Sequence, residues 1–285
     1  MLSNTIIVKH ILLPTDFSEN SLHAIDYAAG LFQDYDCHFY LLNVQKSSEF
    51  ITDDIFGASN NQSIYEAIVD DNKKKLNSLL KTYREKHKAS EITWHALFDY
   101  DVFIDAIRQA IEAKQIDLII MGSNGATGAK EVLFGSNTLR VIRGVDCPVL
   151  MIPEGYQFDS LNEMLFSTVD CKKLNNKTAK IVKDLCQLHH SVLHVLHIQP
   201  DLNEPEHGYD FYLRDVLDGI KYKSHSLKGI PISFAIESFE QLFPVTMNVM
   251  FVPKESFLDR FLFGSKTSQI SYGSDIPLLF LHKSE

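Results

Sequence analysis

Glycines and hydroxyl side chains gather between two short apolar runs, and residues of these types could bind a phosphate group. The runs, 118–121 and 149–152, each have the length of a strand. Glycine lets main-chain amides approach an anion, and a helix start adds unpaired N–H groups and a positive dipole end. Helical spacing begins at Ser136, so the stretch predicts a strand, a loop, a helix and a strand. The glycines before this helix are Gly122, Gly125, Gly128 and Gly135.

The spacing of these glycines differs from that of two common phosphate loops. A Walker loop carries Gly-Lys-Ser/Thr four residues after its first glycine, whereas Lys130 is preceded by alanine. A Rossmann fingerprint needs two glycines one residue apart, and this stretch has none. The pattern present is Gly122, two residues, Gly125, nine residues and then Gly135-Ser136.

This pattern resembles the nucleotide-binding motif of the universal stress protein family, in which two glycines lie beneath the phosphates and the final Gly-Ser opens a helix. The resemblance implies ATP or a related adenine nucleotide as the ligand, and it leaves open whether Mg²⁺ accompanies the phosphates. The alternative, that the glycines only form tight turns, also stays open. The residues assigned to the nucleotide are Pro14, Thr15, Asp16, Val44, Met121, Gly122, Ser123, Asn124, Gly125, Gly135, Ser136, Asn137 and Thr138.

Three of the polar side chains near this motif each have two interpretations. Asp16, which the resemblance places at the adenosine, can accept from ribose hydroxyls or an adenine amine, but it can also cap a helix. Ser136 can donate to a phosphate oxygen or cap the helix that it begins. Lys130 could reach a terminal phosphate or lie solvated in the loop.

Apolar runs of strand length alternate with helical patterns along the first 153 residues. This alternation predicts an α/β fold with parallel strands and right-handed crossovers. The resemblance adds a Rossmann-like, adenine nucleotide alpha hydrolase-like fold: an open five-stranded parallel sheet in the order 3-2-1-4-5, with helices on both faces. Strands 1 and 4 are then neighbours, and the crevice at their carboxyl ends is where such sheets bind ligands. The expected strands are 6–13, 38–44, 92–97, 117–121 and 149–152, and the expected helices follow Ser18 and cover 63–88, 102–114 and 136–143.

The polar segment 45–62 is too long for a tight connection, so it is a candidate for a flexible or ligand-covering loop.

The pattern then starts again, with an expected strand at 163–170, a helix at 174–188 and a strand at 191–198. Asp16 and Val44 are 28 positions apart, and so are Asp170 and Ile198. The offset between the copies is 154 at their starts and 129 at their Phe-Gly-Ser motifs, so the second copy is 25 residues shorter. We expect the loss around the second and third helices, with a strand at 231–236 soon followed by one at 247–252. The predicted domains are 1–153 and 158–285.

The second copy lacks the glycines of the first. Counting back from Gly264 places Phe251 where Gly122 stands and Lys254 where Gly125 stands, and Pro253 has no amide hydrogen to donate. We therefore expect the second copy to hold no nucleotide in the manner of the first and to serve as its structural partner.

Family members generally pair through their last strands, and a chain with two copies can do so internally. The runs 148–152 and 277–281 are similar enough to pair, which would protect two sheet edges. The resemblance thus implies an internal pseudo-dimer, with a homodimer as a further possibility.

Composition narrows the class of protein. The chain has 285 residues, 45% of them hydrophobic, and a formal net charge of −10, which disfavours a nucleic-acid surface. No apolar run is long enough for a membrane helix and the first residues lack a signal-peptide profile, so we expect a cytoplasmic protein. Scattered cysteines without paired spacing suit a reducing compartment. They are Cys37, Cys147, Cys171 and Cys186.

Histidines cluster near the second strand of the second copy, at His189, His190, His194 and His197. His194 and His197 are three apart on a strand and point to opposite faces, which disfavours a shared metal site. A ligand of another kind near His197 stays open.

No motif identifies a catalytic group: the chain has no Gly-x-Ser-x-Gly elbow, no spaced metal triad and no kinase signature. The leading hypothesis is therefore a universal stress protein that binds an adenine nucleotide in its first copy and acts in stress response as a nucleotide-responsive regulator of an unknown protein partner. The alternatives are a scaffold of the same fold that binds no nucleotide, and a weak ATPase.

Overall fold

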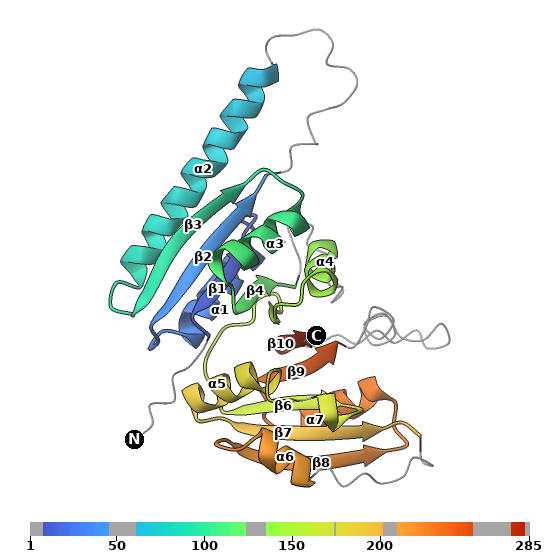
Figure 1. The fold of residues 1–285 in the computed structure, drawn as a ribbon. Coiled ribbons are helices and arrows are strands. Elements are labelled where there is room, and N and C mark those ends of the chain that lie inside the picture. The colour runs from blue at the N-terminus through green and yellow to red at the C-terminus, as the bar shows by residue number, and fades with distance from the viewer. Residues whose placement is uncertain are drawn as a thin grey trace.

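The computed structural model describes residues 8–45, 61–123, 135–173, 175–201, 210–252 and 275–282. Within these ranges the strands form one sheet in the order β3-β2-β1-β4-β5-β10-β9-β6-β7-β8 (Figure 1). Five strands come from each half of the chain, so the two halves share one continuous sheet.

The first half has the predicted strand order, 3-2-1-4-5, with parallel pairing throughout. Its central strands are apolar runs buried on both faces, as parallel strands between two helix layers must be. The elements are β1 (His10–Pro14), α1 (Glu19–Leu31), β2 (Cys37–Val44), α2 (Asn61–Lys86), β3 (Ile92–Asp99), α3 (Phe103–Lys114), β4 (Leu118–Gly122), α4 (Ser136–Gly144) and β5 (Val149–Ile152).

The second half repeats this order as β8-β7-β6-β9-β10, also with parallel pairing. Its elements are β6 (Glu163–Thr168), the 3₁₀ turn η2 (Cys171–Lys173), α5 (Ala179–His189), β7 (Val192–Gln199), α6 (Asp210–Val216), β8 (Lys221–Lys228), α7 (Ile232–Leu242), β9 (Met247–Val252) and β10 (Leu278–His282). Register supports the proposed repeat: Gly122 lies opposite Ile152, and Phe251 lies opposite Leu281.

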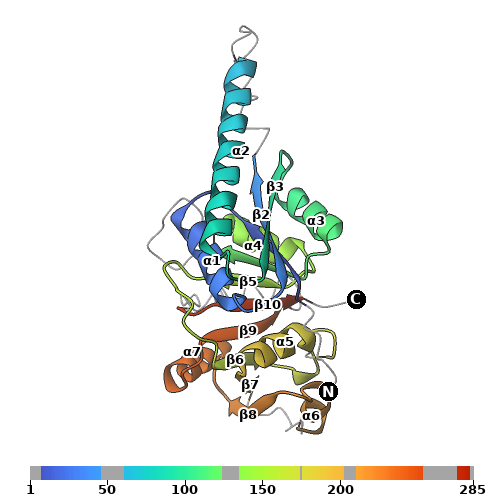
Figure 2. The same ribbon diagram turned by 90° about the vertical axis from the view of Figure 1, so that its left-hand side faces the viewer.

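The halves meet where β5 and β10 pair antiparallel, with Leu150 opposite Leu279, as expected for the two last strands. Figure 2 shows β10 lying between β5 and β9. One apolar core fills the face covered by α1, α2, α5 and α6, and a second fills the face covered by α3, α4 and α7. Both cores include residues from both halves, so each face is stabilised across the joint.

Two expectations for the second half are wrong. The segment 231–236 is the start of α7, with Pro231 as N-cap, and the strand before it is β8. β8 is an edge strand with mostly exposed Lys and Ser side chains, so it lacks the apolar signal of a strand. The third helix is therefore kept, and the shortening lies in the second, which falls from 26 residues in α2 to 7 in α6.

The helix expected from residue 174 begins only at Ala179. Asn175 Oδ1 accepts hydrogen bonds from the amides of Lys177 (2.9 Å) and Thr178 (3.1 Å), a local turn that competes with helix formation. Within the described ranges, no helix has the length and apolar character needed to cross a membrane.

Candidate functional site

The candidate site is the crevice at the carboxyl ends of β1 and β4. These strands are neighbours, with Ile11 opposite Leu118. The helix that follows β1, α1, covers one face of the sheet, and the helix that follows β4, α4, covers the other. After β1 and β4 the chain therefore leaves the sheet toward opposite faces, which opens a crevice between the two strands. Open α/β sheets bind ligands in such crevices.

Hydrogen bonds to β2 hold the turn after β1. Thr15 N donates to Leu42 O at 2.8 Å, and Asn43 Nδ2 donates to Thr15 O at 2.7 Å. Thr15 Oγ1 accepts from the amide of Phe17 at 3.0 Å. Thr15 and Pro14 are buried, so their side chains shape the turn and leave its next residue, Asp16, at the crevice.

Asp16 is exposed, and its Oδ1 accepts hydrogen bonds from the amide (3.0 Å) and the hydroxyl of Ser18. Burial raises the pKa of this carboxyl, but the hydrogen bonds from Ser18 outweigh it, so the pKa lies below its usual value. Ser18 is the N-cap of α1 and accepts from Ser21 N at 3.3 Å. Asp16 thus stabilises the turn before the cap and presents an ionised carboxylate at the crevice.

Gly122, the last residue of β4, is packed against Asn20 in the first turn of α1. A β-carbon at Gly122 would lie 2.6 Å from Asn20 Nδ2 and 2.7 Å from Asn20 Cγ, closer than real β-carbon contacts. Asn20 is only 6% exposed. The position thus requires glycine for close packing of β4 on α1, whatever ligand is present.

Two predicted site residues, Ser123 and Thr138, are buried and close the base of the loop. Thr138 Oγ1 donates to Gly122 O at 3.0 Å and to Ser123 O at 3.3 Å. Gly135 N also donates to Ser123 O, at 2.7 Å. The Thr138 hydroxyl is therefore engaged within the protein, where it fixes the start of α4 against the end of β4.

The start of α4 carries main-chain donors and no side-chain cap. The N-cap is Gly135 and Ser136 is the first residue of the helix, so of the two interpretations of Ser136 the capping one is wrong. The first helical hydrogen bond runs from Leu139 N to Gly135 O at 3.0 Å, and the amides of residues 136–138 have no partner within the helix. Ser136 and Asn137 are exposed. A helix start with unpaired amides and the positive end of the dipole favours an anion.

The remaining predicted residues lie at the same edge or outside the described ranges. Val44 is the half-buried last residue of β2, and Met121 is buried beside Gly122. Asn124, Gly125 and Lys130 lie outside the described residues, as does most of the segment 45–62.

Asn20 and Asn43 are the residues of this region that sequence reasoning missed. The repeat offers a signal for Asn43, because His197 is its equivalent at the offset of 154. In the structure His197 Nε2 lies 3.2 Å from Val169 O, which matches the contact of Asn43 with Thr15 O. Asn20 has no such signal, since its contact joins residues 102 positions apart.

The second crevice repeats the turn of the first but has a larger residue at its base. Lys172 N donates to Asp170 Oδ1 at 3.1 Å, as Ser18 N does to Asp16. Phe251 stands at the register position of Gly122 and packs into the core. Gly264, Lys254 and Pro253 lie outside the described residues.

The histidines of the second half make contacts within the protein. His194 is fully buried, with Nδ1 3.0 Å from His225 Nε2 and the ring against Phe239 and Phe243. Burial lowers the pKa of His194, although Glu163 lies 3.1 Å away. Among the described residues, no group of three or more His, Cys, Asp or Glu side chains could hold a metal ion.

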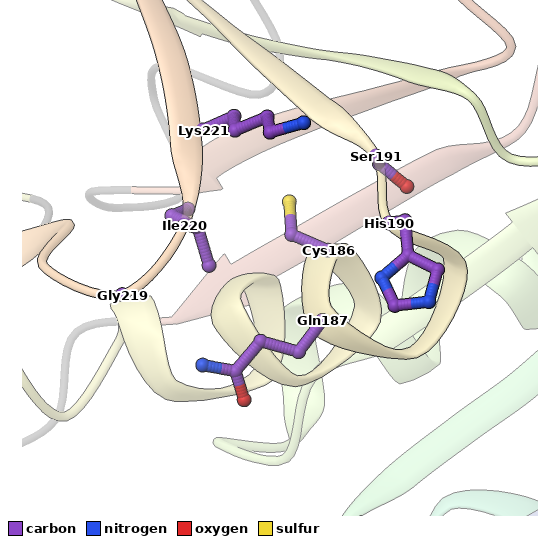
Figure 3. Close-up of a pocket in the computed structure, with 7 residues that line it drawn as sticks. All are labelled: Cys186, Gln187, His190, Ser191, Gly219, Ile220 and Lys221. Atoms are coloured by element: carbon purple, nitrogen blue, oxygen red, sulfur yellow. The ribbon is translucent and has the colours of Figure 1, made fainter.

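A cavity of about 490 Å³ lies in the second half, away from both crevices. It is formed where α5 and α6 end, near the starts of β7 and β8, and Figure 3 shows Cys186 beneath Lys221 in it. Burial raises the pKa of Cys186 to about 12, so its thiol stays protonated. The cavity is lined by Cys186, Gln187, His190, Ser191, Gly219, Ile220 and Lys221.

The strand order and the crevice between β1 and β4 define an open, doubly wound α/β protein with a crevice at its switch point. Residues 8–153 match the model of the Universal stress protein family, and the chain belongs to that family. Universal stress protein MJ0531 of Methanocaldococcus jannaschii is 31% identical over 144 residues, which are 50% of this chain and 81% of the relative. Universal stress protein MJ0577 of the same organism is 32% identical over 158 residues, 52% of this chain and 96% of the relative.

A solved universal stress protein from Archaeoglobus fulgidus is similar over nearly the whole chain. The TM-score is 0.65 at 19% identity, with 96% of this chain and 98% of that chain covered. This similarity extends the fold to the second half, which the family model does not reach.

Proposed function

We propose that this universal stress protein binds ATP or a related adenine nucleotide in a first domain, residues 1–153, and that residues 158–285 form a shortened second domain that is its structural partner. The observation that carries the proposal is the start of α4. The N-cap is a glycine that makes no side-chain cap hydrogen bond, so among the described residues no side chain caps the first-turn amides at the switch-point crevice.

The described residues suggest a role for each side of the crevice. The amides of 136–138 would receive the phosphates, since an anion at a helix start is stabilised by both the N–H groups and the dipole. Asp16, ionised and exposed, would accept from ribose hydroxyls or the adenine amine. Gly122, which has no side chain, would leave room at the bottom of the crevice, and Val44 would lie beside the adenine. A magnesium ion on the phosphates is an optional part of this proposal.

Nucleotide occupancy would then change the surface around the crevice, which a protein partner could recognise. In this proposal the chain acts as a nucleotide-responsive regulator, and slow ATP hydrolysis is the enzymatic alternative. The cytoplasmic location stays a prediction.

The proposal is tested by mass spectrometry of small molecules released from the purified protein, followed by calorimetric titration with ATP. We expect one adenine nucleotide per chain and a higher melting temperature in its presence. A protein that releases no nucleotide and shows neither binding heat nor a melting shift would favour the scaffold function instead.

A further inference from the structure

Two histidines of the second half bind main-chain carbonyls of the first. His189, the last residue of α5, has Nε2 3.0 Å from Leu31 O. His282, the last residue of β10, has Nε2 2.6 Å from Ile142 O. Because a carbonyl oxygen only accepts, the ring nitrogen is the donor in both contacts.

The two carbonyls belong to the two helices that begin at the crevice. Leu31 is the last residue of α1, and Ile142 lies in the last turn of α4. At 13 and 9 residues, α1 and α4 are about 20 Å and about 13 Å long. Each helix thus starts at the candidate nucleotide site and has its far end bound by the second half.

Both contacts lie in packed surroundings. The ring of His189 is 5.6 Å from the ring of Phe158, which is edge-on to Tyr27 of α1 at 5.4 Å. A β-carbon at Gly30 would lie 2.8 Å from Phe158, so the connecting segment is pressed against α1. Side chains from two sides therefore hold the end of α1 against α5.

At the end of α4, His282 has a second constraint. Its Nδ1 is buried and makes no hydrogen bond to the described part of the chain. Burial lowers the pKa of His282, although the Asp146 carboxylate and nearby main-chain carbonyls favour the protonated ring. Arg108 of α3 also donates to the end of α4, with Nε 2.9 Å from Gly144 O.

We propose that His189 and His282 are positioning residues for nucleotide binding: through them the second half holds α1 and α4 so that their starts face each other across the crevice. This inference rests on the proposed nucleotide site. The second half would then contribute to nucleotide binding in the first half without binding a nucleotide in its own crevice. By linkage, a bound nucleotide strengthens the same two contacts.

The test uses the full-length chain with two substitutions at one position. His282→Leu removes the donor, whereas His282→Gln places an amide nitrogen near the position of Nε2. We expect the dissociation constant for ATP to rise between about twofold and tenfold in His282→Leu, as one hydrogen bond is worth, and to return toward wild type in His282→Gln. The same pattern is expected at the other contact: His189→Leu should raise the dissociation constant, and His189→Gln should return it toward wild type. His190→Asn, at an exposed neighbouring position, is the control and should leave the constant unchanged.

Hydrogen exchange of the nucleotide-free protein gives a readout that does not depend on the proposed function. Amides in α4 should exchange faster in His282→Leu than in wild type or His282→Gln, and those in α1 faster in His189→Leu than in His189→Gln. If exchange changes as expected and no variant, wild type included, binds ATP, the nucleotide proposal fails, and what stands is that the two histidines hold the ends of α1 and α4. Equal exchange and equal affinity in the Leu and Gln variants would overturn the positioning role.

Discussion

Asn137→Asp separates the anion site at the start of α4 from the stability of the helix. Asn137 is the second residue of α4 and is exposed, so the nearly isosteric change adds a negative charge without altering packing. A carboxylate in the first turn of a helix is favourable by about 0.3–1 kcal/mol through the dipole. The same carboxylate repels a phosphate bound to the first-turn amides. Stability and affinity should therefore change in opposite directions.

The size of the effect on affinity follows from Coulomb's law. At about 5 Å, two like charges repel by about 0.8 kcal/mol in bulk water, and more where water is partly excluded. This energy corresponds to about a fourfold rise in the dissociation constant for each phosphate charge at that distance. Because a triphosphate carries several charges, about fourfold is the smallest effect that we expect for ATP, and adenosine should be unaffected.

Calorimetric titration with ATP and adenosine measures the affinities, and thermal unfolding without nucleotide measures the stability. Ser233→Asp is the matched control, since Ser233 is likewise the second residue of a helix, α7, in the other half. It should raise the melting temperature slightly and leave ATP affinity unchanged. The reasoning is refuted if wild type binds ATP and Asn137→Asp is more stable but binds ATP equally well, because the phosphates would then lie elsewhere.

Three further predictions concern packing and protonation. Gly122→Ala should lower the unfolding free energy by about 1–3 kcal/mol, as overpacked sites do, because its β-carbon would overlap Asn20; urea denaturation measures this, and an unchanged midpoint would contradict it. Asn43→Leu should destabilise by about 1–3 kcal/mol through the lost donor to the turn after β1, while Asn43→His, the residue of the second half, should cost less in the same assay. Burial lowers the pKa values of His189 and His282 in the folded chain. As pH falls below about 6.5, the usual pKa of histidine, these side chains therefore take up protons in the unfolded chain before they do so in the folded chain. Stability should therefore fall as pH drops below about 6.5, and a double Gln variant whose urea midpoint falls just as steeply would refute this cause.

The sequence predicted the parts of the fold that depend on local patterns. Central strands such as 10–14 and 118–122 are buried on both faces, so their apolar runs were visible. Counting also matched Phe251 to Gly122, and in the sheet the two residues hold equivalent register positions, opposite Leu281 and Ile152. Both inferences depend only on the order and spacing of residues along the chain, which a sequence shows directly.

The sequence did not predict an exposed edge strand or the contacts between residues far apart in the chain. β8 is an edge strand, so Lys and Ser side chains stand where a central strand would have Val or Ile, and the apolar residues of α7 were taken for the strand instead. The contact of Asn20 with Gly122 and the donation from His282 to Ile142, 140 positions apart, need the folded chain. No periodicity reports such pairs.

The backbone amide resonances of Ser136, Asn137 and Thr138 test the central claim most directly when ATP is added to the intact protein. The account predicts that these three signals shift and that their exchange with water slows at saturating ATP, while adenosine produces neither change. ATP that binds without moving them, or that does not bind at all, would contradict it.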